Sequence, residues 1–96
     1  MTNPAVRYLT ARIPGYANVV HIGRRSGRRF RTPVGTTWRG DELRIAVNYG
    51  ERSDWVRNIL KSGAFELEHR GDHLRMTDPH LTTIDGRPTL VATVAH

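Results

Sequence analysis

The sequence predicts a mainly β fold of the α+β class, a small antiparallel barrel with an N-terminal helix and one inserted helix. About five or six short runs of strand-forming residues are separated by turns that contain Gly, Asp or Arg. Strands and helices do not alternate along the chain, which disfavours a parallel sheet. The length of 96 residues provides for one domain with a modest core.

The strands are predicted from short apolar or alternating runs that end at turn residues. Pro33 lacks a backbone N–H, so it places the second strand at an edge or at a bulge. Asp78-Pro79 breaks the alternating pattern and ends the fifth strand. The predicted strands cover residues 17–23, 29–38, 43–48, 65–69, 73–77 and 89–94.

The two helices are predicted from capping residues and from apolar spacing. The first covers residues 4–12, with Pro4 in its first turn. The second begins after Ser53, which caps it, and covers residues 54–61. Its apolar stripe, which we expect to face the core, consists of Val56, Ile59 and Leu60.

The composition excludes several classes of protein. There is no Cys, which rules out disulfides, zinc–thiolate sites and thiol nucleophiles. No apolar run approaches the roughly 20 residues of a membrane-spanning helix, so we expect no membrane insertion. Residues 1–9 lack the apolar core of a signal peptide, and we expect a cytoplasmic protein. The net charge of +6 attracts anions, nucleic acid among them.

The strongest functional signal is a cluster of five arginines between positions 24 and 31. The cluster surrounds a Gly-Ser-Gly turn, and no neighbouring residue in the sequence neutralises it. Arg donates to two oxygens at once, the Ser26 hydroxyl adds a donor, and successive turn N–H groups form an anion nest. Gly23 and Gly27 permit a close backbone approach. The turn therefore predicts a phosphate or carboxylate ligand, and the alternative is a solvated basic hairpin.

A second group of residues links the third strand to the inserted helix. Gly50 permits a close approach, and the N-terminus of the helix beyond Ser53 offers N–H groups to an anion. Tyr49 and Trp55 are placed to flank a planar ring. The alternative is that Ser53 is a simple cap and Trp55 a core residue.

No constellation of catalytic side chains is evident in the sequence. The histidines lack the spacing of a metal site, and no nucleophile elbow or phosphate-binding lysine motif is present. An anion site and ring-stacking residues without catalytic side chains indicate that a bound cofactor performs the chemistry.

Two motifs in the sequence resemble those of a known family. The run Gly23-Arg24-Arg25-Ser26-Gly27, followed by Arg31-Thr32-Pro33, resembles the signature of the deazaflavin-dependent nitroreductase family. The later Tyr49-Gly50, Asp54-Trp55 and Asn58-Ile59 pattern is similar to the family's second motif. The resemblance covers roughly residues 7–80. Residues 81–96 depart from the family's usual ending, so we expect either that the C-terminal part of the domain is shortened or that a partner chain completes the pocket.

The resemblance implies a split, FMN-binding-like barrel that uses coenzyme F420. It implies that Arg24, Arg25, Ser26 and Arg31 contact the phosphate and the acidic tail of the cofactor. The deazaflavin ring or its phosphate-side loop would be lined by Asn48, Tyr49, Gly50 and Trp55. The full set of implied cofactor-binding residues is Arg24, Arg25, Ser26, Gly27, Arg31, Thr32, Pro33, Asn48, Tyr49, Gly50 and Trp55.

The favoured function is hydride transfer from reduced deazaflavin to a small electron acceptor, namely a quinone, a nitroaromatic or an activated alkene. A second interpretation keeps the fold and substitutes FMN or another flavin. A third is a non-enzymatic F420 carrier. The least favoured is a small nucleic-acid-binding barrel, which would show exposed aromatics among the basic residues of one face.

We also expect a homodimer, because a barrel of this size leaves apolar surface uncovered. Trp38 and the Phe65–Leu67 face are the predicted apolar surface.

Overall fold

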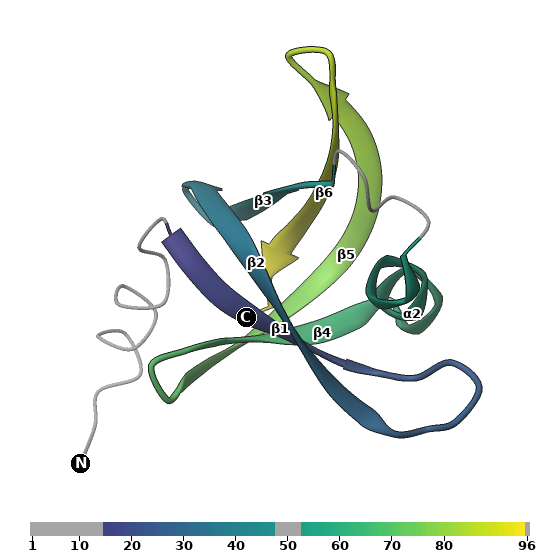
Figure 1. Cartoon of the computed structure of the whole chain (residues 1–96). Coiled ribbons are helices and arrows are strands. Elements are labelled where there is room, and N and C mark those ends of the chain that lie inside the picture. The colour runs from purple at the N-terminus through teal and green to yellow at the C-terminus, as the bar shows by residue number, and fades with distance from the viewer. Residues whose placement is uncertain (1–14, 48–52, 96) are drawn as a thin grey trace.

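The computed structural model describes residues 15–47 and 53–95 as a closed six-stranded antiparallel barrel (Figure 1). The order around the barrel is β1-β2-β3-β6-β5-β4, and pairing of β4 with β1 closes it. The strands are β1 (Gly15–Ile22), β2 (Arg29–Arg39), β3 (Glu42–Ala46), β4 (Ala64–His69), β5 (Asp72–Ile84) and β6 (Arg87–Val94), with helix α2 (Asp54–Ser62) between β3 and β4.

This architecture confirms the predicted mainly β class, the antiparallel barrel and the inserted helix. The predicted N-terminal helix over residues 4–12 lies outside the described residues. In residues 15–47 and 53–95, no helix has the length and apolar character needed to cross a membrane.

The core fills the barrel because side chains on each strand alternate between its interior and its outer face. Residues that are completely or almost completely buried come from every strand and from α2, so the interior is one continuous apolar cluster. The largest of them are Leu43, Ile45, Ile59, Leu67, Met76 and Leu90. Phe65 and Leu67 belong to this core, so the prediction that they form an exposed face is wrong. Trp38 is partly buried against the same cluster.

Helix α2 begins and ends where local signals predict. Val56 and Ile59 are fully buried in the barrel core, and the helix contacts β1, β4 and β5. Gly63 ends the helix in the left-handed region, with φ of 78°, and its N–H donates to the Ile59 carbonyl at 2.8 Å. Ser53 occupies the N-cap position with an extended backbone but makes no side-chain cap hydrogen bond, which corrects the predicted capping.

The predicted strand break at Asp78-Pro79 is wrong, because β5 continues through it to Ile84. The register between β5 and β6 shifts between Thr77 and His80, and Asp78 has φ of 52°. A bulge of this kind accommodates a proline that cannot donate to the ladder. The last two pairs of β5 with β6, Thr83 with Pro88 and Ile84 with Arg87, lie past the end of β3 and form a two-stranded arm that stands away from the barrel (Figure 1).

Candidate anion and cofactor site

The turn between β1 and β2 is a compact loop closed by its own backbone. The Gly23 N–H donates to the Arg28 carbonyl at 2.8 Å, and the Gly27 N–H donates to the Gly23 carbonyl at 2.9 Å. The Arg28 N–H donates to the Ser26 hydroxyl at 3.2 Å. Residues 23–28, which we call the arginine turn, therefore have a defined conformation.

Gly23 is required by the packing of this turn. A Cβ atom at Gly23 would lie 2.5 Å from Ser26 Oγ and 3.0 Å from Phe30 Cε2. Both distances are shorter than ordinary contacts, so a larger residue would displace the Ser26 hydroxyl, the Phe30 ring, or both.

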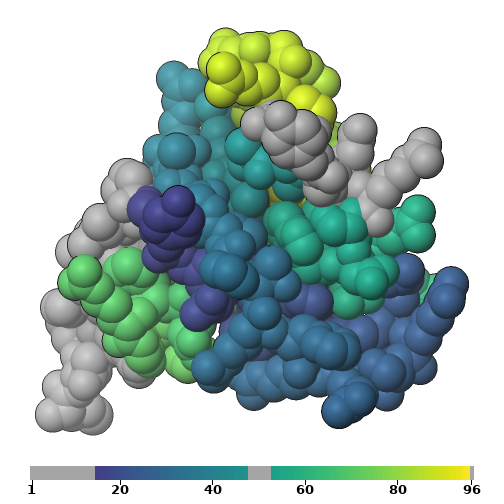
Figure 2. All heavy atoms as spheres, in the orientation of Figure 1, coloured from purple at the N-terminus to yellow at the C-terminus, as the bar shows by residue number. Residues whose placement is uncertain are grey.

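Arg24 fastens the arginine turn to helix α2. Its backbone N–H and its Nη1 each donate to Asn58 Oδ1 at 3.0 Å, and Nη1 lies 3.2 Å from Asp54 Oδ1. Figure 2 shows the blue end of the β1–β2 hairpin beside the teal-green helix. Arg24 is thus held by the protein itself, whereas the resemblance implied that it contacts a ligand.

A cavity of about 210 Å³ lies where the turn meets the helix. Its lining residues are Gly23, Arg24, Arg25, Ser26, Asp54 and Asn58. Within residues 15–47 and 53–95, the exposed side chains of Arg25 and Arg28 form no ion pair, and the N–H groups of Arg25 and Ser26 have no acceptor. The cavity therefore combines a hydroxyl with available cationic and N–H donors, which suits an anion.

A buried histidine connects the turn, the helix and β2. His21 Nε2 is 3.0 Å from Thr32 Oγ1, and His21 Nδ1 is 3.0 Å from Asn58 Nδ2. The imidazole also stacks on Phe30, with ring centroids 5.7 Å apart. Burial lowers the pKa of His21, and the nearby Asp54 carboxylate opposes this shift. The resulting neutral imidazole accepts from Asn58 at Nδ1 and donates from Nε2 to Thr32.

Neither His21 nor Asn58 was predicted as a site residue. Two signals pointed to Asn58: its place in the second motif, and its position between Val56 and Ile59 on the buried stripe of α2. A polar side chain among core positions requires hydrogen-bond partners inside the protein, and here they are Arg24 and His21.

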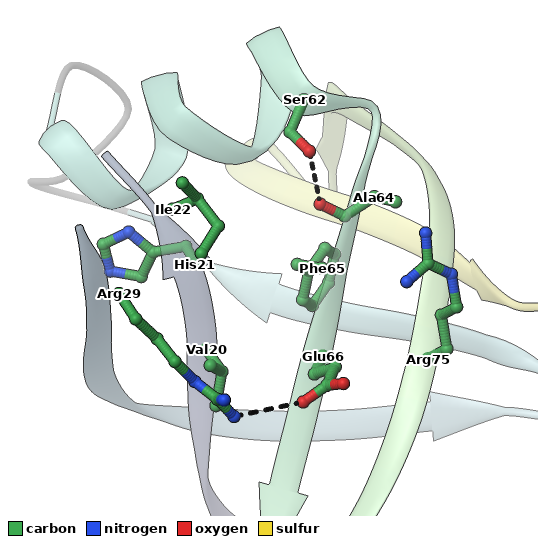
Figure 3. A pocket seen from close by; sticks show the side chains of 9 residues that line it. All are labelled: Val20, His21, Ile22, Arg29, Ser62, Ala64, Phe65, Glu66 and Arg75. Carbon is green, nitrogen blue, oxygen red and sulfur yellow. Dashed lines mark hydrogen bonds and ion pairs between the residues drawn. The ribbon is translucent and has the colours of Figure 1, made fainter. Parts of the chain in front are cut away.

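The remaining arginines of the cluster lie on the outer wall of the barrel. Arg29 Nη2 is 3.4 Å from Glu66 Oε2, and Arg31 Nη2 is 2.9 Å from Glu68 Oε2. Figure 3 shows the first of these ion pairs at a second cavity of about 320 Å³. That cavity is lined by Val20, His21, Ile22, Arg29, Ser62, Ala64, Phe65, Glu66 and Arg75. Carboxylates from β4 therefore neutralise part of the cluster, which the local sequence did not indicate.

The structure thus brings together only part of the predicted set. Arg24, Arg25 and Ser26 line one cavity, and Gly27 belongs to the same turn. Arg31 is on the outer wall, Thr32 contacts His21, and Pro33 pairs with Asn18. Trp55 lies in the first turn of α2, partly buried against the core. The predicted residues outside the described part of the chain are Asn48, Tyr49 and Gly50.

No group of His, Asp and Glu suited to a metal ion occurs among residues 15–47 and 53–95. Independently of this finding, the nitrogen and hydroxyl donors of the arginine turn suit an organic or phosphate anion.

Comparison with known families shows a match that spans almost the whole chain. The profile of the family described as F420H(2)-dependent quinone reductase matches residues 5–95. The matched range includes residues 81–95, whereas the motif resemblance covered only residues 7–80. No curated protein matches the chain.

Proposed function

Because the chain belongs to the F420H(2)-dependent quinone reductase family and is an F420-dependent oxidoreductase, we propose that it reduces a quinone with F420H2. The observation that carries this proposal is the cavity at the arginine turn, where Arg25 and two N–H groups have no partner among residues 15–47 and 53–95.

The residues of the arginine turn fit the anionic part of the cofactor. A cavity of about 210 Å³ is smaller than a typical site for a whole ligand, so it suits one phosphate-sized group. Arg25 supplies a planar pair of donors, Ser26 a hydroxyl, and the turn backbone two N–H groups. The ion pair of Asp54 with Arg24 reduces the repulsion between that carboxylate and a bound anion.

The roles of the remaining residues follow from their positions. Arg31 lies on the outer wall of β2, and we assign it to the acidic tail of the cofactor. Its guanidinium would bind the tail either while it stays paired with Glu68 or after that ion pair breaks. Trp55 is partly buried at the start of α2, and together with Asn48, Tyr49 and Gly50 it would contact the deazaflavin ring. Gly27, Thr32 and Pro33 support the turn and the strand that carry these contacts.

The protein's contribution to the reaction is binding, orientation and exclusion of water. Bound F420H2 supplies the hydride, and the quinone becomes a hydroquinone when it takes up that hydride and a proton. Anchoring the anionic group at the arginine turn fixes one end of the cofactor, so the ring is held in one place when the acceptor arrives. Nitroaromatics and activated alkenes are further proposed acceptors, because both are electron-poor.

The test is a fluorescence titration with F420, followed by oxidation of F420H2 in the presence of a naphthoquinone. Arg25→Ala should weaken F420 binding by about 1–3 kcal/mol, the scale of a charge-assisted hydrogen bond. Arg87→Ala, at the far tip of the β5–β6 arm, is the matched control and should bind F420 normally. Equal affinity in Arg25→Ala and wild type would remove this turn from the cofactor site.

The same preparation separates the other interpretations. Titration with FMN but not with F420 would favour a flavin protein. F420 binding without oxidation of F420H2 by any of the three acceptor classes would favour a carrier. Nucleic-acid binding that persists at physiological salt, without F420 binding, would favour a nucleic-acid protein.

A further inference from the structure

Asn58 is a polar residue in a position that favours an apolar one. It is 4 % exposed and lies on the core-facing side of α2 beside the fully buried Val56 and Ile59. Burying an amide has a free-energy cost unless its hydrogen bonds are satisfied. The amide of Asn58 is satisfied by residues of the arginine turn and by His21, and by nothing else among the described residues.

We propose that Asn58 is a positioning residue: it holds the arginine turn in its anion-binding conformation and makes that conformation depend on a neutral His21. The proposal deepens the proposed function, because it takes F420 as the anion that the turn binds. It assigns to Asn58 no contact with the cofactor or the acceptor.

The oxygen of Asn58 determines the direction of Arg24. It accepts from both the backbone N–H and the Nη1 of Arg24, each at 3.0 Å. Because its backbone N–H and its guanidinium are both bound to α2, Arg24 fixes the direction in which the chain enters the turn. In this conformation the N–H groups of Arg25 and Ser26 lie at the cavity without an acceptor among the residues that the structure describes.

The nitrogen of Asn58 requires an acceptor. Since the oxygen already receives two donors, the amide cannot flip without placing its NH2 group against the donors of Arg24. The nitrogen therefore donates to His21 Nδ1, 3.0 Å away, which is possible only while that atom carries no proton. When His21 is protonated, its Nδ1–H points at the NH2 group of Asn58, and two donors face each other. Asn58 must then give up either its hydrogen bond to His21 or its hydrogen bonds to Arg24.

Charged groups surround His21 on several elements. Asp54 on α2 favours the imidazolium, and Asp54 is itself paired with Arg24 of the turn. The second cavity, of about 320 Å³, is lined by His21 together with Arg29 on β2, Glu66 on β4 and Arg75 on β5. Glu66 is already paired with Arg29.

Two substitutions at Asn58 separate positioning from simple packing. Asn58→Leu removes both the acceptor for Arg24 and the donor for His21. Asn58→Asp keeps the acceptor for Arg24 and replaces the donor with a second acceptor, which suits a protonated His21. Val56→Ala is the matched control, because it destabilises the same helix without touching the polar contacts.

Two measurements are made on each full-length variant between about pH 5 and about pH 8, the range in which histidine titrates. The first is the rate of tryptic cleavage after Arg25 and Arg28, which reports the conformation of the turn. The second is F420 affinity by fluorescence. In wild type we expect cleavage to rise and affinity to fall together as the pH drops.

At neutral pH, Asn58→Leu should bind F420 roughly tenfold more weakly or worse, the effect of losing hydrogen bonds to a charged group, and should be cleaved faster. Asn58→Asp should keep a protected turn and lose the decline in acid. Val56→Ala should keep the wild-type pH dependence of affinity. The proposal is overturned if Asn58→Leu matches wild type in both measurements, or if Asn58→Asp loses turn protection as Asn58→Leu does. If wild type fails to bind F420, the proposed function fails, and the cleavage rates alone decide the role of Asn58.

Discussion

At the scale of single residues, the buried imidazole of His21 makes the stability of this protein sensitive to acid. Burial lowers its pKa in the folded state, with Asp54 opposing, while the unfolded chain retains a value near 6.5. The contribution of the neutral ring to stability is complete above the unfolded pKa and is lost as the pH falls below it toward the lowered folded value. Urea unfolding at about pH 7.5 and about pH 5.5 should therefore show a smaller free energy of unfolding in acid.

Substitution identifies the histidine responsible. His21→Gln should be less stable than wild type at neutral pH and should show a smaller loss of stability on acidification. His80→Gln changes an exposed histidine whose ring lies 3.1 Å from the Asp78 carbonyl, outside the His21 network, and it should keep the wild-type pH dependence. An unchanged pH dependence in His21→Gln would contradict this account.

Gly23 is the residue whose replacement most directly tests the shape of the arginine turn. Gly23→Ala forces its new methyl group against Ser26 Oγ and Phe30, so the turn must rearrange. We expect F420 affinity to fall by about 1–3 kcal/mol, the scale of one lost charge-assisted contact. Gly35→Ala is the control, because a Cβ there meets nothing within 4 Å and should change affinity by less than about 0.5 kcal/mol.

The residue-level prediction from sequence was partial for a physical reason. The Gly-Ser-Gly turn is encoded by adjacent residues, so the cavity-lining Arg25 and Ser26 were found from local sequence. The partners of Arg24, Arg29 and Arg31 are distant in the sequence: Asp54, Asn58, Glu66 and Glu68. Only the register of β1 with β4 and the docking of α2 place these partners, and neither can be read from the turn itself.

At the scale of elements, helix α2 is stabilised mainly by its buried face. Ile59→Ala removes a fully buried side chain and should lower the free energy of unfolding by about 2–5 kcal/mol. Leu60, the next residue, is 38 % exposed, so Leu60→Ala should cost less than about 1 kcal/mol. Chemical denaturation of both variants measures the difference. Equal losses would mean that the helix packs through a different face.

The elements predicted best are those bounded by strong local signals. The αL glycine at position 63 ends α2, and two-residue turns at Arg70-Gly71 and Asp85-Gly86 join β4 to β5 and β5 to β6. In both turns the two residues have positive φ, as a type I′ turn requires. The course of β5 through Asp78-Pro79 was missed, because a bulge keeps pairing with β6 that the local sequence disfavours.

At the scale of the whole molecule, we still expect a homodimer, although the apolar surface differs from the predicted one. Phe65 and Leu67 are interior, whereas Ile22 and Phe30 are 49 % and 43 % exposed on either side of the arginine turn. Paired chains would cover these side chains next to the cofactor site. Light scattering at micromolar concentration should give the mass of two chains. The mass of one chain, about 10.9 kDa, would exclude the dimer at that concentration.

Closure of the barrel by β1 and β4 also determines when the binding site comes into existence during folding. Asn18 pairs with Glu68, and Arg24 contacts Asn58, so both pairings close long loops of chain. Such non-local contacts form late and make folding slow. During synthesis, β1 and β2 leave the ribosome before α2 does. At that stage the arginines of the turn are present, but the residues of α2 that hold Arg24 are not. F420 is consequently expected to retard unfolding of the finished barrel while leaving the rate of its folding unchanged.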